Sequence, residues 1–324
     1  MMNQETINFI LQRMVVFLDN AQMLELKDIL DEIVRQEDTS LLTKSSEELL
    51  EMFLATKRLE GRSENTLFLY RFNIGKMLEK AEKNVCVMNT DDVRSYLSSY
   101  QENNGVSKAT VDNVRRNLSS FFRWLEDENY IFKSPMRRIH KIKTSVTVKE
   151  TYSDEDLERL RDECKALRNL AIIDMLNSTG VRVSELVNLD IEDIDFEERE
   201  CVVLGKGDKE RIVYFDARTK IHLQKYLNAR NDPNPALFVS TRSPHHRLKA
   251  GGVEMMLKKM GKLTNVNHCH PHKFRRTMAT VAIDKGMPVE QVQKLLGHDQ
   301  IDTTMHYAMV KQSNVKISHK KYIG

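Results

Sequence analysis

A stretch of unmixed positive charge divides this chain of 324 residues into two parts. KSPMRRIHKIKTSVTVK, residues 133–149, holds six cations and no acid, and Pro135 prevents a helix from running through it. A connection of this kind between two folded parts can follow a polyanion backbone without reading its sequence. The sequence therefore predicts two domains joined by a basic linker over 133–150.

The net charge supports this interpretation once it is divided along the chain. Residues 1–38 hold three cations and eight acids, so they contribute −5 to a total of +3 and leave +8 for the remainder. Residues 1–43 are predicted to be an acidic extension, with apolar side chains at helical spacings over 3–18 and 22–35. Because phosphates repel acidic helices, this extension is expected to pack on protein or to lie in solvent.

Targeting and redox features favour a cytoplasmic location. The apolar run INFILQRMVVFL is interrupted by Gln12 and Arg13 and lacks a cleavage-site pattern, so neither a signal peptide nor a membrane span is expected. The four cysteines lie far apart in the sequence, which is typical of reduced thiols rather than of a disulfide framework.

Hydrophobic periodicity predicts helices through most of the chain. Residues 44–132 give four or five short helices, and the helix that Ser107 opens has one apolar face. The opposite face of that helix and the linker offer cations to phosphate. These predicted DNA contacts are Lys108, Arg115, Arg116, Arg123, Arg137, Arg138, Lys141 and Lys143.

A second domain is predicted over 151–324. Its sequence gives helices near 154–162, 166–178 and 183–188, followed by strand-like runs at 200–204 and 211–215. The runs flank GKGDKE, so they are expected to form a β-hairpin whose turn presents lysines, among them Lys206.

Two pairs in this domain place polar groups three positions apart. Arg182 and Glu185 in TGVRVSEL would share a helix face, where the carboxylate can hold the guanidinium. In HPHKFRRTMAT, Pro271 suits a first helical turn, and His272 and Arg275 have the same spacing. Taken alone, the first pair could be a surface ion pair worth under about 1 kcal/mol.

The C-terminal part adds a histidine and a tyrosine at a fixed interval. A helix over 288–296 is expected to end at Gly297, so that His298 lies just beyond its end and Tyr307 nine residues further on. A tyrosine hydroxyl, with an ordinary pKa of about 10, needs a nearby acceptor and positive charge to act as a nucleophile.

These side chains suit phosphoryl transfer without a metal. Two guanidiniums can grip both non-bridging oxygens of a phosphodiester and offset the charge of a five-coordinate phosphorus, a task that a divalent ion performs in other enzymes. A lysine can protonate the departing alkoxide. No metal or other cofactor is expected.

From about Lys44 to Tyr307 the sequence resembles the tyrosine recombinases of the phage-integrase and Xer family. The resemblance implies a catalytic set at the positions that match the family's motifs: Arg182, with Glu185 as its acidic neighbour; Lys206 of GKGDKER; His272 and Arg275 of the H-x-x-R box; His298 of LGH; and Tyr307, the nucleophile.

The resemblance also implies a fold and partners. The expected fold is mostly α: a helical core-binding domain (44–132) and a mostly helical catalytic domain (151–324) with a small antiparallel β-sheet, closing as a C-shaped clamp on DNA. The implied partners are double-stranded DNA with inverted-repeat core sites and further copies of the chain in a DNA-bound tetramer. The implied reaction cuts and rejoins DNA through a 3′-phosphotyrosyl intermediate, in integration, excision or dimer resolution.

Departures and alternatives accompany this resemblance. Arg276 stands where many relatives have the histidine of R-H-T, and the acidic N-terminus is unlike the basic arm-binding domain of some integrases. A DNA-binding regulator with the same fold, or a type IB topoisomerase-like enzyme that relaxes DNA, would share much of the pattern. The cluster of His268, Cys269, His270 and His272 suggests zinc, but alternate positions on one short stretch rarely supply four convergent ligands.

Overall fold

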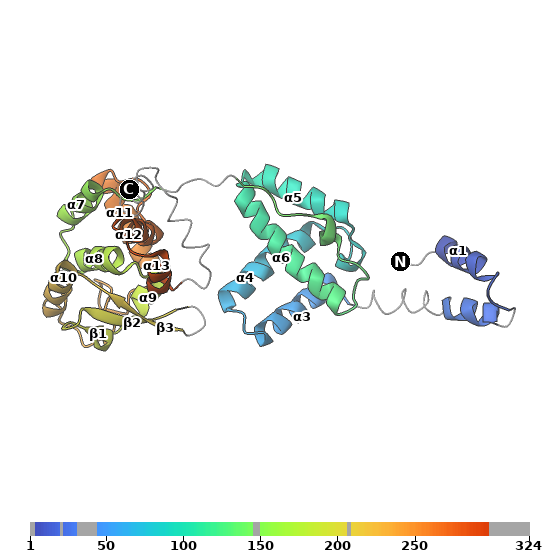
Figure 1. Cartoon of the computed structure of the whole chain (residues 1–324), viewed down its shortest axis with the longest axis horizontal. Helices are drawn as coiled ribbons and strands as arrows, with labels where there is room; N and C mark the ends of the chain where they lie inside the picture. The colour runs from blue at the N-terminus through green and yellow to red at the C-terminus, as the bar shows by residue number, and fades with distance from the viewer. Residues whose placement is uncertain (1–3, 20–21, 31–43, 145–149, 206–208, 298–324) are drawn as a thin grey trace, which may run out of the picture. The chain divides into compact units, whose positions relative to one another are not determined.

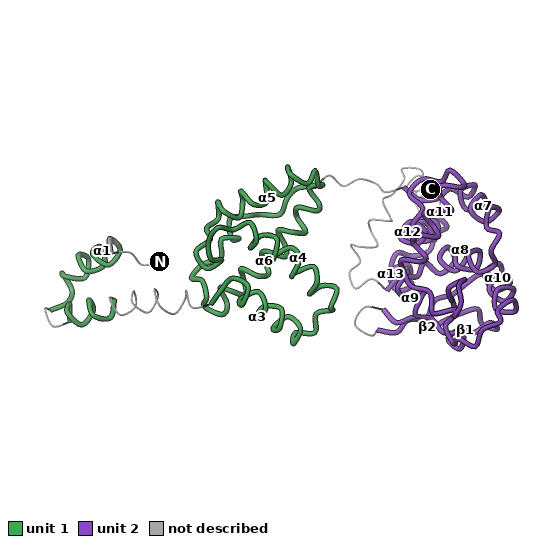
Figure 2. The backbone as a smooth tube through the Cα atoms, turned by 180° about the vertical axis from the view of Figure 1, so that it is seen from behind, with its two compact units in different colours: residues 1–146 green, residues 147–324 purple. Residues whose placement is uncertain are grey.

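The computed structural model describes residues 4–19, 22–30, 44–144, 150–205 and 209–297 (Figure 1). The chain forms two compact units, residues 1–146 and 147–324 (Figure 2). The boundary between the units falls within the segment predicted to be a linker. The division of the chain into four segments, and the clamp that the two domains would form, stay predictions.

Helices make up the first unit's regular structure. In chain order they are α1 (Gln4–Met14), a helical segment at 22–30, α3 (Ser46–Leu59), α4 (Glu64–Lys80), the 3-10 helix η1 (Val85–Val87), α5 (Thr90–Asn104), α6 (Lys108–Asp127) and the 3-10 helix η2 (Pro135–Arg138).

Side-chain caps fix where these helices begin. Ser45 and Glu48 form a capping box at α3, Asn89 and Asp92 form another at α5, and the Ser107 hydroxyl accepts from the third backbone N–H of α6. Helices α3, α4 and α6 then pack their apolar faces together around aromatic side chains.

The first part of the predicted linker packs against the first unit. Met136 in η2 is only 5% exposed and belongs to that unit's core. Further along, the backbone N–H of Ile142 donates to the buried carboxylate of Asp112 at 3.0 Å. The chain is therefore attached to the first unit as far as Ile142.

The second unit is also mostly helical. Its elements are α7 (Asp154–Asp162), α8 (Leu167–Thr179), α9 (Val183–Asn188), η3 (Ile191–Asp193), β1 (Ile194–Asp195), β2 (Glu200–Leu204), β3 (Glu210–Tyr214), α10 (Ala217–Asn228), α11 (Ala250–Thr264), α12 (Pro271–Asp284) and α13 (Val289–Leu296).

Helix α8 lies at the centre of the second unit (Figure 1). It contacts α7, α9, α10, α12 and β3, and every side chain from Ala171 to Leu176 is buried. A helix that is buried around most of its circumference needs apolar residues on more than one face, which this run supplies. Around it the core joins the inner faces of α7, α9, α10, α11, the start of α12 and the sheet, whereas buried residues of α12 and α13 form a separate small cluster.

The strands form one antiparallel sheet in the order β1-β2-β3. The predicted hairpin is present, with Cys201 opposite Val213 and both side chains buried. The two-residue strand β1 was not predicted, because a run so short shows no alternation. The predicted fold class, mostly helical with a small antiparallel sheet, is confirmed. Among the described residues, no helix is both long and apolar enough to span a membrane.

Candidate active site

Arg182 and Glu185 form the predicted ion pair at the start of α9. Arg182 is the N-cap residue, with extended backbone angles, and Glu185 lies in the first turn. One carboxylate oxygen of Glu185 accepts from Arg182 Nη1 at 2.7 Å and the other accepts from the Arg182 backbone N–H at 2.7 Å. The pair therefore holds both the guanidinium and the cap of the helix.

A third side chain, Arg211 of strand β3, completes this cluster. Its Nη1 and Nη2 donate to the two oxygens of Glu185 at 2.8 and 2.7 Å, in a bidentate arrangement. The side chains of Arg211 and Glu185 are 11% and 3% exposed, so the contact is largely shielded from water. Bidentate guanidinium–carboxylate contacts fix the orientation of both groups as well as their separation.

Burial and positive charge act in opposite directions on Glu185. Burial alone would raise the pKa of its carboxyl, but hydrogen bonds from Arg211 and from the backbone and side chain of Arg182 lower that pKa to about 2. Glu185 is therefore a carboxylate at neutral pH. It offsets one of the two cationic charges that contact it.

Helix α12 carries His272 and Arg275 in its first turns, after Pro271 at the first helical position. His272 is exposed, whereas Arg275 is 2% exposed. Arg275 Nη1 donates to the carbonyl of Gly180 at 2.7 Å, and Nη2 donates to the carbonyl of Leu296. Because Gly180 lies two residues before Arg182, this contact joins α12 to the segment that leads into α9.

Three arginines converge on the C-terminal end of α13. Its last carbonyls, those of Leu295, Leu296 and Gly297, are here called the α13 terminus. They accept from Arg211 Nε at 3.0 Å, from Arg275 Nη2 and from Arg182 Nη2 at 3.1 Å, respectively. Carbonyls at a helix end lack intrahelical donors and carry partial negative charge, so cations are favourable there. The α13 terminus therefore accepts from guanidiniums at the start of α9, on α12 and on β3.

Gly297 ends α13 as the sequence predicted. Its φ of +63° is left-handed, a conformation that favours glycine, and an added Cβ would lie 3.0 Å from Arg211 Cδ. The glycine thus permits both the sharp end of the helix and the close approach of Arg211.

The other predicted catalytic residues lie outside the described part of the chain. These are Lys206, His298 and Tyr307. Their described neighbours are Gly205, which closes the hairpin by donating its N–H to the Lys209 carbonyl at 2.8 Å, and Gly297 at the α13 terminus. The structure brings Arg182, Glu185 and Arg275 to one place, and their catalytic roles stay predictions.

The predicted DNA-binding cations differ in their environments. Lys108, Arg116, Arg123, Arg138, Lys141 and Lys143 are exposed, as is Arg137, which pairs with Glu126 at 2.5 Å. Arg115 differs from the expectation of an outward cation, because its side chain is 13% exposed and pairs with the buried Asp112 at 2.8 Å. Burial raises the pKa of Asp112, but hydrogen bonds from Arg115 and the Ile142 N–H outweigh this and lower it.

Arg211 is the residue of this cluster that sequence reasoning missed. The signal that could have found it is the alternation of β3, which places Arg211 two residues before the buried Val213 and so on the same face. A charged residue at an inward position requires a partner. Among the described residues, which include the cluster from His268 to His272, no group of three or more His, Cys, Asp or Glu could hold a metal.

Two family models match this chain. Residues 150–314 match the model of the phage integrase family, and residues 49–131 match that of the phage integrase N-terminal SAM-like domain. Tyrosine recombinase XerC of Oceanobacillus iheyensis is 34% identical over 244 residues, which are 71% of this chain and 79% of the relative. Tyrosine recombinase XerA of Pyrococcus horikoshii is 29% identical over 278 residues, 85% and 93% of the two chains.

Among solved structures, the fold is similar to that of the XerH site-specific recombinase bound to a palindromic difH substrate in a post-cleavage complex. The TM-score is 0.68 at 21% identity, over 97% of this chain and 94% of that one. The family model matches more than half of the chain and includes all six predicted catalytic positions. The chain therefore belongs to the phage integrase family, the family of the tyrosine recombinases.

Proposed function

We propose that this tyrosine-type site-specific DNA recombinase cleaves DNA by attack of Tyr307 on a phosphodiester held by Arg182 and Arg275. The observation that supports the proposal is the convergence of both guanidiniums on the α13 terminus, ten residues before Tyr307 in the sequence. Two arginines far apart in the chain thus contact the helix end that directly precedes His298 in the sequence.

The charge of the cluster suits a phosphate. Arg182 and Arg211 contact the carboxylate of Glu185, and Arg275 contacts the α13 terminus, so these four side chains carry a formal charge of +2. Of the two arginines assigned to the phosphate, Arg182 is the more accessible, with 31% of its side chain exposed. A guanidinium has five N–H donors, so its carbonyl and carboxylate contacts orient it and still permit contact with a phosphate oxygen.

The proposed reaction proceeds by transesterification. The Tyr307 oxygen forms a bond to phosphorus as the bond from phosphorus to the 5′ oxygen breaks, which leaves a 3′-phosphotyrosine and a 5′ hydroxyl. His272 or His298 would accept the single tyrosine proton, and Lys206 would donate a proton to the 5′ oxygen. Arg182 and Arg275 would stabilise the charge on the non-bridging oxygens. Attack by the 5′ hydroxyl of another strand reverses these steps and rejoins the DNA, so neither a nucleotide nor a metal is required.

The proposed partners follow from the same chemistry. DNA with inverted repeats would present two half-sites to two copies of the chain, and two such sites would assemble a tetramer, acting in the cytoplasm. That XerH is bound to a palindromic substrate supports this proposal. The exposed cations of α6 and of the segment after it would contact the phosphates of each half-site.

A nicked half-site substrate that traps the covalent intermediate tests the proposal. Full-length protein should form an adduct at the 3′ phosphate in the presence of a chelator. Tyr307→Phe should shift the DNA in a gel yet form no adduct, whereas the matched control Tyr322→Phe should form it normally. An adduct that persists in Tyr307→Phe, or that requires added magnesium or zinc, would contradict the mechanism.

The same assay separates the alternatives. A DNA-binding regulator would shift the substrate without any adduct in the unmutated protein. A topoisomerase-like enzyme would form the adduct and relax supercoiled DNA that lacks paired sites, whereas a recombinase would exchange strands between two sites.

A further inference from the structure

Arg211 contacts the protein with every nitrogen of its guanidinium. Nη1 and Nη2 donate to Glu185 and Nε donates to the Leu295 carbonyl, while 11% of the side chain is exposed. Arg182 and Arg275 match the family's catalytic arginines, but no motif used above assigns a role to Arg211. Its position suggests that it acts on the site through its neighbours.

We propose that Arg211 is a positioning residue for DNA cleavage, which orients Arg182 through Glu185 and ties this pair to the α13 terminus. The inference rests on the proposed function, in which Arg182 holds the scissile phosphate. It adds a residue on strand β3 to the set on which cleavage depends.

Arg182 and Arg211 share one carboxylate oxygen of Glu185. Oε1 of Glu185 accepts from Arg182 Nη1 at 2.7 Å and from Arg211 Nη1 at 2.8 Å. The planar fork of Arg211 sets the rotation of the carboxylate, since it contacts both oxygens at once. The rotation in turn sets the point at which the Arg182 guanidinium is held. Without Arg211, the carboxylate can rotate and Arg182 can leave its position.

The α13 terminus also connects Arg211 to Arg182. Arg211 Nε and Arg182 Nη2 contact carbonyls two residues apart on the same helix end, and both arginines contact Glu185. Arg182, Glu185, Arg211 and the α13 terminus therefore form a closed circuit of contacts. Such a circuit restricts Arg182 more than a single ion pair would, because moving one member strains the other contacts.

A double-mutant cycle tests the proposal. Single-turnover cleavage of the nicked half-site is measured at saturating protein for the unmutated chain, Arg211→Met, Arg182→Lys and the double variant. Arg211→Met should cleave about 100-fold more slowly, the loss expected from misplacing a catalytic group by about 1 Å. In the Arg182→Lys background the same change should slow cleavage by about threefold or less, because Arg211 acts through the group already altered. Half-site affinity should change by less than about threefold, since the effect falls on the chemical step.

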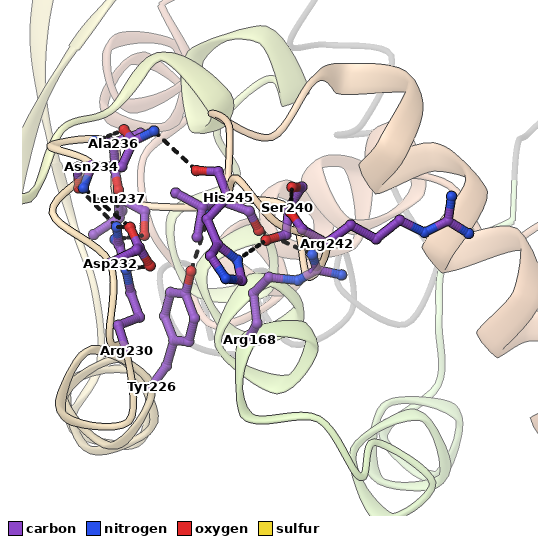
Figure 3. Close-up of polar contacts among 11 residues, drawn as sticks. Arg168, Tyr226, Arg230, Asp232, Asn234, Ala236, Leu237, Ser240, Arg242 and His245 are labelled. Carbon is purple, nitrogen blue, oxygen red and sulfur yellow. Dashed lines mark hydrogen bonds and ion pairs between the residues drawn. The ribbon is translucent and has the colours of Figure 1, made fainter.

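Arg230→Met is the matched control. Arg230 is 7% exposed, and it also donates to a carboxylate, that of Asp232, and to the carbonyls of Ala236 and Leu237 (Figure 3). It belongs to the same unit but contacts neither Glu185 nor the α13 terminus in the contacts described. Its replacement should lower stability to a similar extent. If Arg230→Met slows cleavage at all, it should do so by the same factor in the unmutated chain and in the Arg182→Lys background.

If Arg211→Met unfolds at the assay temperature, Arg211→Lys takes its place in the double-mutant cycle. Lysine preserves a charge beside Glu185 but not the bidentate fork. It should slow cleavage by about tenfold or more with Arg182 present and have little effect with Arg182→Lys. Equal factors in the two backgrounds, for either Arg211 variant, would show a merely structural role and overturn the inference. Failure of the proposed function is distinct, because Arg182→Lys or Tyr307→Phe would then leave cleavage unchanged.

Discussion

Glu185→Gln is the substitution that most directly measures how the site is held together. Glu185 is 4% exposed, and its carboxylate accepts from two guanidiniums and one backbone N–H. Glutamine has almost the same shape but is neutral, so it leaves Arg211 buried beside an uncharged group. Its amide NH2 group would also take the place of one carboxylate oxygen and present N–H donors to a guanidinium, which can only donate.

Two independent estimates give the loss of unfolding free energy expected for Glu185→Gln. Removing one partner of a buried ion pair costs about 3–5 kcal/mol of unfolding free energy. The pKa of Glu185 falls from 4.5 to about 2 on folding, and at 1.36 kcal/mol per unit this corresponds to about 3 kcal/mol. We therefore expect Glu185→Gln to lower the unfolding free energy by about 3 kcal/mol at pH 7.

The stabilisation that the Glu185 carboxylate contributes should decrease at acid pH. Because folding lowers this pKa, the stabilisation is fully present above the unfolded value of 4.5 and is lost as the pH falls toward the folded value of about 2. The difference in unfolding free energy between the unmutated protein and Glu185→Gln should therefore shrink by about half between pH 7 and pH 3.

Urea denaturation at several pH values, with single-turnover cleavage measured on the same samples, checks the prediction. Asp174→Asn is the control, since Asp174 is 1% exposed and contacts Arg161 at 2.8 Å and His222 at 2.5 Å in the same unit. Both variants should be destabilised, but only Glu185→Gln should retain a cleavage defect under conditions where each protein is fully folded. A stability loss under about 1 kcal/mol at pH 7, typical of exposed pairs, would refute the reasoning. So would a loss that does not change with pH.

Two further predictions separate roles that charge alone does not distinguish. Lys206→Ala should cleave an ordinary phosphodiester slowly and a 5′-bridging phosphorothiolate at nearly the unmutated rate, because a thiolate leaves without a proton; rescue of Lys209→Ala instead would move the acid role to Lys209. Arg116→Ala, at a side chain 64% exposed, should weaken half-site binding and reduce its salt dependence by about one counterion, whereas Arg115→Ala should lower stability and leave that salt dependence unchanged. The same salt slope in both variants would show that exposure does not identify the phosphate contacts.

Local patterns predicted the elements that hold the site. The spacing of Arg182 and Glu185 predicted their ion pair, and Gly297 predicted the end of α13. These features depend on residues within one helical turn, so a short window of sequence contains the interacting groups.

Contacts between distant segments were not predicted. Arg211 lies 26 residues from Glu185 and 84 from Leu295, and the alternation of β3 shows only that it faces inward. Arg115 was placed correctly on α6 but assigned to the wrong environment, because Asp112 is buried and draws the guanidinium toward it. An acid within an apolar stripe needs cationic or N–H partners, and this requirement could have predicted the inward contact.

Arg276 shows how a departure from the family pattern is accommodated. In the structure its Nε donates to the carbonyl of Glu150 at 2.8 Å. Two residues later, the Tyr152 N–H donates to Thr277 Oγ1 at 2.9 Å, and the Tyr152 ring packs on Phe274 of the same helix. The chain that enters the second unit is thus fastened along α12, the helix that carries His272 and Arg275. The arginine at position 276 therefore holds this entering segment against the helix that carries His272 and Arg275.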